Sequence, residues 1–340
     1  MSKLRAGLIG VGSMGVKVLG ELDHNDLFEL AALSDSNREQ AEECGRRYGV
    51  PAYDDNRSLI VQEKLDVLFM TLPTFQCDEC IQLAAKRGIH IFKQAPLART
   101  LPEAMEWVKL MSRAGLKFYV GAARRFAPGY LHAHQKLQQG RIGEVYLVRA
   151  ESFLNFEGDF NWRGDPLLAG GGVLLEQAYH MIDQIVWDMG LPVQLYSLNT
   201  NRCSIRVLPP YRTEDTVVLT MKFSHGTMGS VLAGWMTGPA CERLVLHGTA
   251  GTIEVNANRL RIFDEAGQLV EDDKYHVNET WMISQQLRHF ADSLLDEEVK
   301  PISTAQEHLA NIAVIDSAYL SARTQLPETL KVYGSLFEIK

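Results

Sequence analysis

The feature that most constrains the fold is a glycine-rich turn near the start of the chain. Residues 10–15 read Gly-Val-Gly-Ser-Met-Gly; an apolar run, residues 4–9, precedes them and a helical pattern of apolar residues follows. In such a strand–turn–helix unit the first glycine makes the tight turn, the second lets the backbone approach a pyrophosphate, and the third allows close packing of helix on strand. The turn therefore predicts an α/β unit that binds an anion at the start of the helix.

An acidic residue stands where a nucleotide ribose would be bound. Asp35 ends the next apolar strand, 20 positions after Gly15 (35 − 15 = 20). Its carboxylate can accept from a free ribose 2′-hydroxyl and would repel a 2′-phosphate, which favours NAD. Arg38 offers a guanidinium and leaves NADP open. The cofactor contacts expected from this part of the chain are Gly10, Gly12, Ser13, Met14, Gly15, Asp35, Ser36 and Arg38.

The first 122 residues alternate apolar strands with helical patterns. This alternation predicts a doubly wound parallel sheet, a Rossmann-type NAD(P)-binding domain, whose ligand lies beyond the carboxyl ends of the strands. The expected strands are residues 4–9, 28–34, 66–71, 89–93 and 117–121. Two of these strands, near residues 66–71 and 89–93, end on residues that we expect at the ligand site. They are Thr71, Leu72, Pro73, Thr74, Lys93, Gln94, Ala95 and Pro96.

The pattern changes in the second half, which predicts an α+β domain over residues 123–340, built on a predominantly antiparallel open sheet. Residues 216–223 alternate in character with period two, and His225-Gly226 makes a hairpin turn into residues 227–235. Further strands are expected at 242–248, 251–256 and 259–263, and helices at 173–189, 279–295 and 305–323. The last helix is free to pack back on the first domain. A sheet face without enough helices to cover it favours a homodimer or homotetramer.

Composition excludes several classes of protein. A net charge of −8 and a pI near 5.7 give no electrostatic footprint for nucleic acid. No apolar run approaches the ~18 residues that suggest a membrane span. The chain enters its first strand at once, which argues against a secretory signal. Five scattered cysteines fit a reducing compartment, so cytoplasm is expected.

Two cysteines, Cys77 and Cys80, have the spacing of a redox pair or of half a zinc site. No second pair is apparent in the sequence, and the two fall at the start of an expected helix. We interpret them as structural.

Three polar residues on the expected helix 173–189 form a candidate catalytic group. Glu176, His180 and Asp183 stand at i, i+4 and i+7, which places them on one helix face. A histidine beside a carboxylate suits general acid–base catalysis, because the carboxylate fixes its tautomer and raises its basicity. A helix-surface ion pair is the alternative. A metal triad is conceivable from these residue types, but no metal is expected.

The order of motifs resembles the glucose–fructose oxidoreductase/inositol dehydrogenase (Gfo/Idh/MocA) family over nearly the whole chain. The landmarks are Gly10 to Gly15, Thr71 to Pro73, Ala95 to Ala98, Arg124 to Pro128, Gly140 to Val145, Trp162-Arg163, Gly170 to Gly172, Glu176 to Asp183, Glu214 to Thr216 and His247 to Thr252. The resemblance implies NAD or NADP as cofactor and hydride transfer to or from a carbon of a small carbohydrate-like substrate. It also implies that His180 acts on the substrate hydroxyl, and that Pro73, Thr74, Arg124, Trp162 and Arg163 line the cofactor and substrate region. Arg124 and Arg125 can alternatively form structural ion pairs.

One departure from the family affects the chemistry. The family reads Glu-Lys-Pro at the end of its fourth main strand, and its lysine acts with the histidine; here the place reads Gln94-Ala95-Pro96. Gln94 can still hydrogen-bond a ribose, but Ala95 can move no proton. Lys93, two residues before Ala95, lies on the same side of an extended strand. Lys93 either replaces the missing lysine or is an ordinary strand residue. The family also leads us to expect a cis bond before Pro96.

The missing lysine keeps three functions in view. The leading hypothesis is an NAD(P)-dependent dehydrogenase of a sugar, sugar derivative or cyclitol, with His180 as acid–base group. A second is an NAD-dependent glycosidase or epimerase that oxidises its substrate transiently. A third is a non-catalytic regulator that senses the nucleotide.

Overall fold

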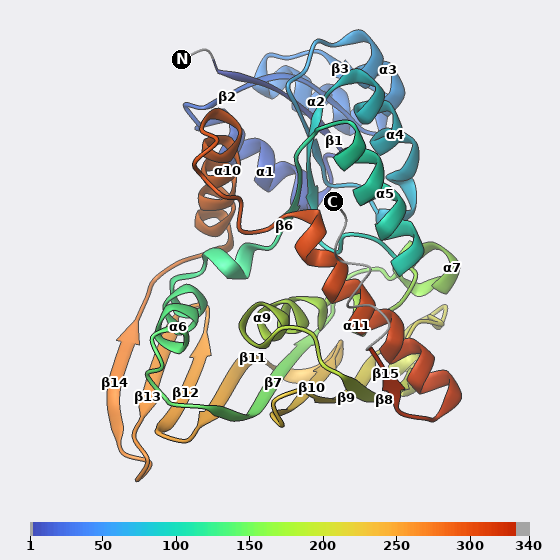
Figure 1. Cartoon of the computed structure of the whole chain (residues 1–340). Helices are drawn as coiled ribbons and strands as arrows, with labels where there is room; N and C mark the ends of the chain where they lie inside the picture. Colours follow the sequence, from blue (N-terminus) through green and yellow to red (C-terminus); the bar gives the residue numbers. More distant parts are fainter. Residues whose placement is uncertain (1–2, 331–340) are drawn as a thin grey trace. The chain divides into compact units, whose positions relative to one another are not determined.

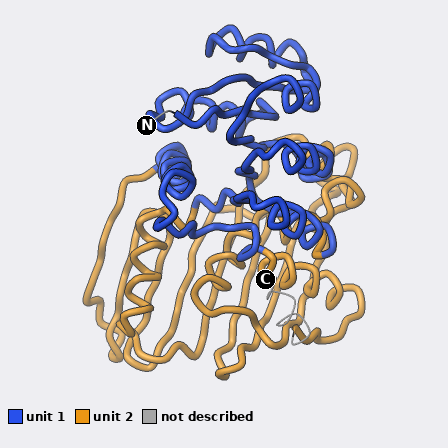
Figure 2. The backbone as a smooth tube through the Cα atoms, turned by 45° about the horizontal axis from the view of Figure 1, so that its top comes forward, with its two compact units in different colours: residues 1–98, 102–123, 278–308 blue, residues 99–101, 124–277, 309–340 orange. Residues whose placement is uncertain are grey.

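The computed structural model describes residues 3–330, which form two compact units (Figure 2). Unit 1 contains residues 1–98, 102–123 and 278–308, and unit 2 contains residues 99–101, 124–277 and 309–340. The sequence-based assignment of residues 278–308 to the second domain is corrected by this division. No helix among the described residues is long and apolar enough to cross a membrane.

Unit 1 is built on a six-stranded sheet in the order β3-β2-β1-β4-β5-β6, and each neighbouring pair is parallel. The expected doubly wound sheet is therefore confirmed. β3 has two residues, too short for a recognisable pattern, and was not predicted. The strands are β1 (Leu4–Ile9), β2 (Phe28–Ser34), β3 (Ala52–Tyr53), β4 (Val67–Met70), β5 (His90–Gln94) and β6 (Phe118–Gly121).

Helices cover both faces of this sheet. In Figure 1, α1 and α10 lie on one side of the sheet, and α3, α4 and α5 lie on the other. Their bounds are α1 (Ser13–Asp23), α2 (Arg38–Tyr48), α3 (Asn56–Gln62), α4 (Asp78–Arg87), α5 (Leu101–Arg113) and α10 (Glu279–Leu295). α2 and α4 each end on a left-handed glycine, Gly49 and Gly88, at φ +68° and +73°.

An aromatic cluster explains why α10 belongs to unit 1. The ring of Phe290 lies 5.1 Å from that of Tyr119, 5.6 Å from Phe92 and 6.2 Å from Phe69, measured between centroids. Such aromatic contacts add to the large apolar area that the rings bury. α10 also packs against α1, so a segment late in the chain completes the dinucleotide-binding fold.

Unit 2 is built on a nine-stranded sheet in the order β14-β13-β12-β11-β7-β10-β9-β8-β15. β7 and β10 pair in parallel and the other neighbours are antiparallel, as expected for a predominantly antiparallel sheet. The strands are β7 (Val145–Asn155), β8 (Gln194–Thr200), β9 (Thr216–Lys222), β10 (Met228–Gly234), β11 (Met236–Gly248), β12 (Gly251–Asn256), β13 (Arg259–Phe263), β14 (Leu269–Lys274) and β15 (Glu328–Thr329).

One face of this sheet carries the helices of unit 2 (Figure 1). They are α6 (Pro128–Gln138), the short α7 (Pro166–Ala169) and α8 (Val173–Glu176), α9 (Tyr179–Met189) and most of α11 (Ala305–Thr324). The single helix expected over 173–189 is wrong, because a turn at Gln177 and Ala178 separates α8 from α9. The amide of Ala178 bonds the carbonyl of Val173 at 2.8 Å, five residues back, which widens the helix locally.

Candidate active site

The three positions of the turn after β1 are glycine for different structural reasons. Gly10 has φ +87°, a left-handed conformation that suits glycine. A Cβ on Gly15 would lie 2.0 Å from the carbonyl oxygen of Gly10, so only glycine lets α1 pack this closely on the turn. A Cβ on Gly12 would meet nothing within 4 Å. Gly10 and Gly15 are therefore required by the fold, whereas Gly12 leaves a bare stretch of backbone facing open space.

The start of α1 can receive an anion. Gly12 and Ser13 are exposed, and among the described residues no side chain caps this helix or places a negative charge in its first turn. The amide groups of the first turn have no partner within the helix, and the helix dipole favours negative charge there. Together with the open space at Gly12, this fits the pyrophosphate of a dinucleotide.

Asp35 holds the turn through both oxygens of its carboxylate. Its Oδ2 accepts from the amide of Val11 at 2.7 Å and its Oδ1 accepts from the amide of Asn37 at 2.8 Å. The side-chain amide of Gln40 donates to the carbonyl of Val11 at 2.7 Å. The peptides on both sides of Val11 are thus fixed from the end of β2 and the start of α2. A carboxylate has about four lone-pair sites, so Asp35 keeps capacity for a ribose hydroxyl.

Two neighbours of Asp35 are exposed. Ser36 faces solvent at the end of β2. The Nε of Arg38 donates to Glu42 at 2.8 Å, and both side chains are largely solvent-accessible. A 2′-phosphate would have to compete with Glu42 for this guanidinium and would face the Asp35 carboxylate, so the local charges favour NAD.

The segment after β4 is tied to the glycine turn. The hydroxyl of Thr71 donates to the carbonyl of Gly10, and Leu72 lies against the Cα of Gly10. Pro73 and Thr74 then lead into a short 3-10 turn, Thr74–Gln76, with Thr74 buried. The ends of β1 and β4 therefore form one surface.

Lys93 is fully buried at the end of β5, with 1% of its surface exposed. Its Nζ donates to the hydroxyl of Thr74 at 3.3 Å and to the carbonyls of Gln94 at 3.1 Å and Pro96 at 2.5 Å. Burial lowers the pKa of this lysine from its usual range. Because three acceptors occupy its three N–H bonds, this geometry argues against the expectation that Lys93 replaces the family's catalytic lysine. It is also more than an ordinary strand residue.

The strand end that follows Lys93 has the expected backbone. The peptide bond between Ala95 and Pro96 is cis, as the resemblance implied. The amide of Gln94 lies over Gly121 of β6, where an added Cβ would be 2.6 Å from its Oε1.

In unit 2, Glu176 is bound to Arg163. The Nε of Arg163 donates to Oε2 of Glu176 at 2.8 Å, and its guanidinium carbon lies 4.4 Å from the ring centroid of Trp162. Burial raises the pKa of the Glu176 carboxyl, and the charge of Arg163 opposes that rise. The structure thus joins Glu176 to the Trp162-Arg163 motif, which the sequence analysis had named separately from it.

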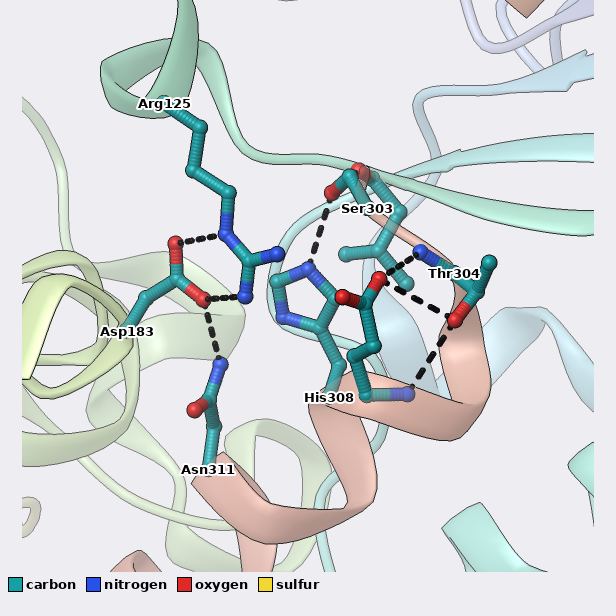
Figure 3. A network of polar contacts seen from close by, with 8 residues as sticks. Arg125, Asp183, Ser303, Thr304, His308 and Asn311 are labelled. Carbon is teal, nitrogen blue, oxygen red and sulfur yellow. Dashed lines mark hydrogen bonds and ion pairs between the residues drawn. The ribbon is translucent and has the colours of Figure 1, made fainter. Parts of the chain in front are cut away.

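Asp183, which the sequence analysis placed in the candidate catalytic group, lies in a buried polar network (Figure 3). It is buried, and its two oxygens accept from Nε and Nη2 of Arg125 at 3.0 and 2.7 Å. Its Oδ1 also accepts from Asn311 of α11 at 2.8 Å. A bidentate Arg–carboxylate pair in a dry environment is strong and directional. Asp183 therefore anchors α9 to the segment before α6 and to α11.

Arg124 is also used structurally. Its guanidinium pairs with Glu242 of β11, which in turn accepts from the hydroxyl of Tyr130 at 3.0 Å. The alternative of an ion pair is thus present in the structure, and the cofactor contact of Arg124 stays a prediction.

His180 stands in the first turn of α9 and is partly exposed. Its ring meets the ring of Tyr179 edge-on, with centroids 5.9 Å apart. Of the three residues expected on one helix face, His180 and Glu176 are accessible and Asp183 is buried.

The segment that leads into α8 is fixed by a half-buried glutamate that the sequence analysis did not single out as a site residue. Glu214 accepts from the amides of Gly172 and Leu174 at 2.8 and 3.0 Å and from the hydroxyl of Tyr319 at 2.8 Å. A Cβ on Gly171 would lie 1.8 Å from the Tyr319 oxygen. Close packing against Tyr319 and Glu214 explains why Gly171 and Gly172 are glycines. No local sequence signal reveals Tyr319 as a partner of Glu214, or Asn311 as a partner of Asp183.

Cys77 and Cys80 are both buried free thiols. Cys77 donates to the carbonyl of Pro73, and burial raises the pKa of Cys80 to about 12. Among residues 3–330 there is no group of three or more metal-ligating side chains. Their surroundings favour the structural interpretation.

Comparison with known proteins identifies the family. Residues 4–122 match the oxidoreductase family with an NAD-binding Rossmann fold, and residues 130–254 match the C-terminal domain of the same Gfo/Idh/MocA family. The chain belongs to the Gfo/Idh/MocA family. It is an NAD(P)-dependent oxidoreductase, as the sequence predicted.

Individual relatives have low sequence identity to this chain but align over most of its length. The levoglucosan dehydrogenase of Pseudarthrobacter phenanthrenivorans is 28% identical, covering 76% of this chain and 75% of its own. The scyllo-inositol 2-dehydrogenase (NAD(+)) of Bacillus subtilis is 23% identical and covers 97% of both chains. A structure of levoglucosan dehydrogenase with NADH and levoglucosan superposes with a TM-score of 0.89 at 21% identity, covering 97% of this chain and 100% of that one.

The different reasons for Gly12 and Gly15 can be separated by mutation. We expect Gly12→Ala to keep the native melting temperature but to lose NADH binding by at least ~10-fold, because its Cβ enters only the space of the ligand. Gly15→Ala should lower the melting temperature, since its Cβ collides with backbone. Thermal unfolding and NADH fluorescence titration check both. A Gly12→Ala protein that binds NADH normally would contradict the assignment of the pyrophosphate to this turn.

Proposed function

We propose that the protein is an NAD-dependent dehydrogenase that oxidises a carbinol carbon of a sugar, sugar derivative or cyclitol. The observation that carries this proposal is the joint presence of an intact dinucleotide turn with Asp35 and a partly exposed imidazole, His180, on α9. Relatives named levoglucosan dehydrogenase and myo-inositol 2-dehydrogenase support the substrate class.

The residues divide into chemical and positioning roles. Bound NAD supplies the hydride acceptor. His180 takes the proton of the substrate hydroxyl, a general-base role for which an imidazole is suited. Glu176 and Arg163 form a charged pair one helical turn before His180 and present polar groups for substrate hydroxyls. Asp183 and Glu214 hold α9 and α8 in place rather than moving protons.

The absence of a lysine at position 95 sharpens the role of His180. The side chain of Ala95 can neither donate a hydrogen bond to a developing alkoxide nor relay its proton. The three N–H bonds of Lys93 already have acceptors in the segments after β4 and β5. We therefore assign proton transfer to His180 alone.

The chain also favours NAD over NADP in this proposal. Asp35 brings a carboxylate to the proposed ribose position, and Arg38 is paired with Glu42. Both features act against a 2′-phosphate.

Substitution of His180 tests the catalytic assignment. A screen of sugars and cyclitols with NAD at 340 nm, the NADH absorbance, identifies a substrate. His180→Gln should then reduce kcat by roughly 10²–10⁴-fold, the usual contribution of a positioned acid–base group, and leave NADH affinity unchanged. His225→Gln, in the exposed hairpin turn between β9 and β10, is the matched control and should keep wild-type turnover.

Two results would refute the proposal. Wild-type turnover in His180→Gln would remove the proton-transfer role. Release of an aglycone from a glycoside without net formation of NADH would instead support the NAD-dependent glycosidase, the alternative that the absence of a lysine at position 95 raised.

We further propose that the protein forms a homodimer or homotetramer through the sheet face of unit 2 that bears no helices. Leu198, Val218 and Leu232 are register partners on β8, β9 and β10, so they form one row, and all three are exposed. In the next strands the row continues into Glu151 and Arg243, which pair at 2.8 Å. An apolar row bordered by charge is typical of a protein interface.

Analytical ultracentrifugation tests this interface. Val218→Glu buries a charge in the proposed contact and should convert the assembly to monomer while each chain keeps its fold. A wild-type protein that sediments as a monomer at micromolar concentration would contradict the proposal.

A cytoplasmic location is proposed on the cysteines. All five are free thiols, and three of them are buried. Free thiols persist in a reducing compartment.

A further inference from the structure

We propose that Lys93 is a positioning residue for the nicotinamide half of NAD: its ammonium joins the segment after β4 to the segment after β5. The inference rests on the dinucleotide site and does not require the proposed sugar substrate. It assigns to this chain a buried cation that stabilises the cofactor-binding edge of the sheet without touching the reacting atoms.

The contacts of Lys93 join two segments that are distant in sequence. One acceptor, Thr74, follows β4, and the other two, the carbonyls of Gln94 and Pro96, follow β5. An ammonium has three N–H bonds, and each has an acceptor here. An apolar side chain at this position would leave two carbonyls and a hydroxyl without this donor. Unsatisfied acceptors in a buried environment cost free energy.

The strand order shows which half of the cofactor lies over these segments. In the proposed binding mode Asp35, at the end of β2, would accept from the adenosine ribose, and the pyrophosphate would lie on the turn after β1. β4 and β5 follow on the opposite side of β1 from β2. A dinucleotide that spans this edge must place its nicotinamide half beyond β4 and β5, where Lys93 fixes the backbone.

The hydroxyl of Thr74 makes the connection specific. It accepts from Lys93, and a hydroxyl has one donor besides its acceptor sites, so Thr74 keeps its own O–H for another acceptor. Thr71, three residues earlier, is already bonded to the glycine turn. Lys93 thus adds β5 to a surface that the ends of β1 and β4 already share.

The test compares two ligands that differ only in the nicotinamide portion. Lys93→Met keeps an unbranched side chain as far as Cε and removes the ammonium group. We expect its Kd for NADH to rise by ~10-fold or more, which is about 1.4 kcal/mol, and its Kd for ADP-ribose to stay within ~2-fold of wild type. Calorimetric titration of both ligands, without any sugar, measures this. Failure of the dehydrogenase proposal would leave this result unaffected.

Two controls keep the interpretation clear. Lys117→Met removes a partly buried lysine at the opposite, amino-terminal edge of the same sheet, where it donates to Ser293, and should change neither Kd. Thr74→Val removes the Lys93 acceptor and should weaken NADH selectively, whereas Thr74→Ser should not. If Lys93→Met does not fold, an unchanged NADH affinity in Thr74→Val still contradicts the proposal, because this variant removes the Lys93–Thr74 contact.

Two outcomes would overturn the proposal. Equal weakening of NADH and ADP-ribose would give Lys93 a general role in the stability of unit 1. Unchanged affinities with a large loss of kcat on an identified substrate would make Lys93 a proton-transfer residue instead.

Discussion

The dinucleotide site depends on the fixation of one peptide segment, Gly10 to Gly12. The amide of Val11 is held by Asp35 and its carbonyl by Gln40, while the carbonyl of Gly10 accepts from Thr71. Three chain segments, the ends of β2 and β4 and the start of α2, therefore converge on a turn in which only Val11 carries a side chain. A ligand that binds through backbone amides gains most when that backbone is already in place, because little ordering cost remains.

Buried charges carry much of the positioning in both units. Buried Asp183 pairs with Arg125 and Asn311, and buried Lys93 bonds Thr74. Half-buried Glu214 bonds Tyr319. Removing one partner of a buried ion pair costs about 3–5 kcal/mol because the other charge is left uncompensated. These groups therefore enforce one geometry of the strand ends and helix starts that carry the chemistry. His180, by contrast, is partly exposed.

Local patterns were sufficient for most of the fold and for the cofactor-binding turn. The strands of unit 1 and the helix Glu279–Leu295 follow from hydrophobic periodicity, and the glycine turn with Asp35 follows from spacing. Periodicity did not reveal that Glu279–Leu295 returns to the first sheet, because that depends on Phe290 meeting rings far away in the chain. The same limit applies to Asp183, Arg124 and Lys93: residue type suggested chemistry, whereas partners at Arg125, Glu242 and Thr74 give them structural tasks. The turn at Gln177 was hidden because its sequence remains helical in character.

The most direct test of the account follows the hydride itself. A substrate found in the screen is prepared with deuterium on the carbinol carbon that reacts, and the nicotinamide product is analysed by mass spectrometry after a single turnover. The account predicts reduced nicotinamide carrying one deuterium and, in equal amount, a ketone product that has lost it. Deuterium that remains in the sugar product, or passes to water, while NAD stays oxidised would contradict net dehydrogenation.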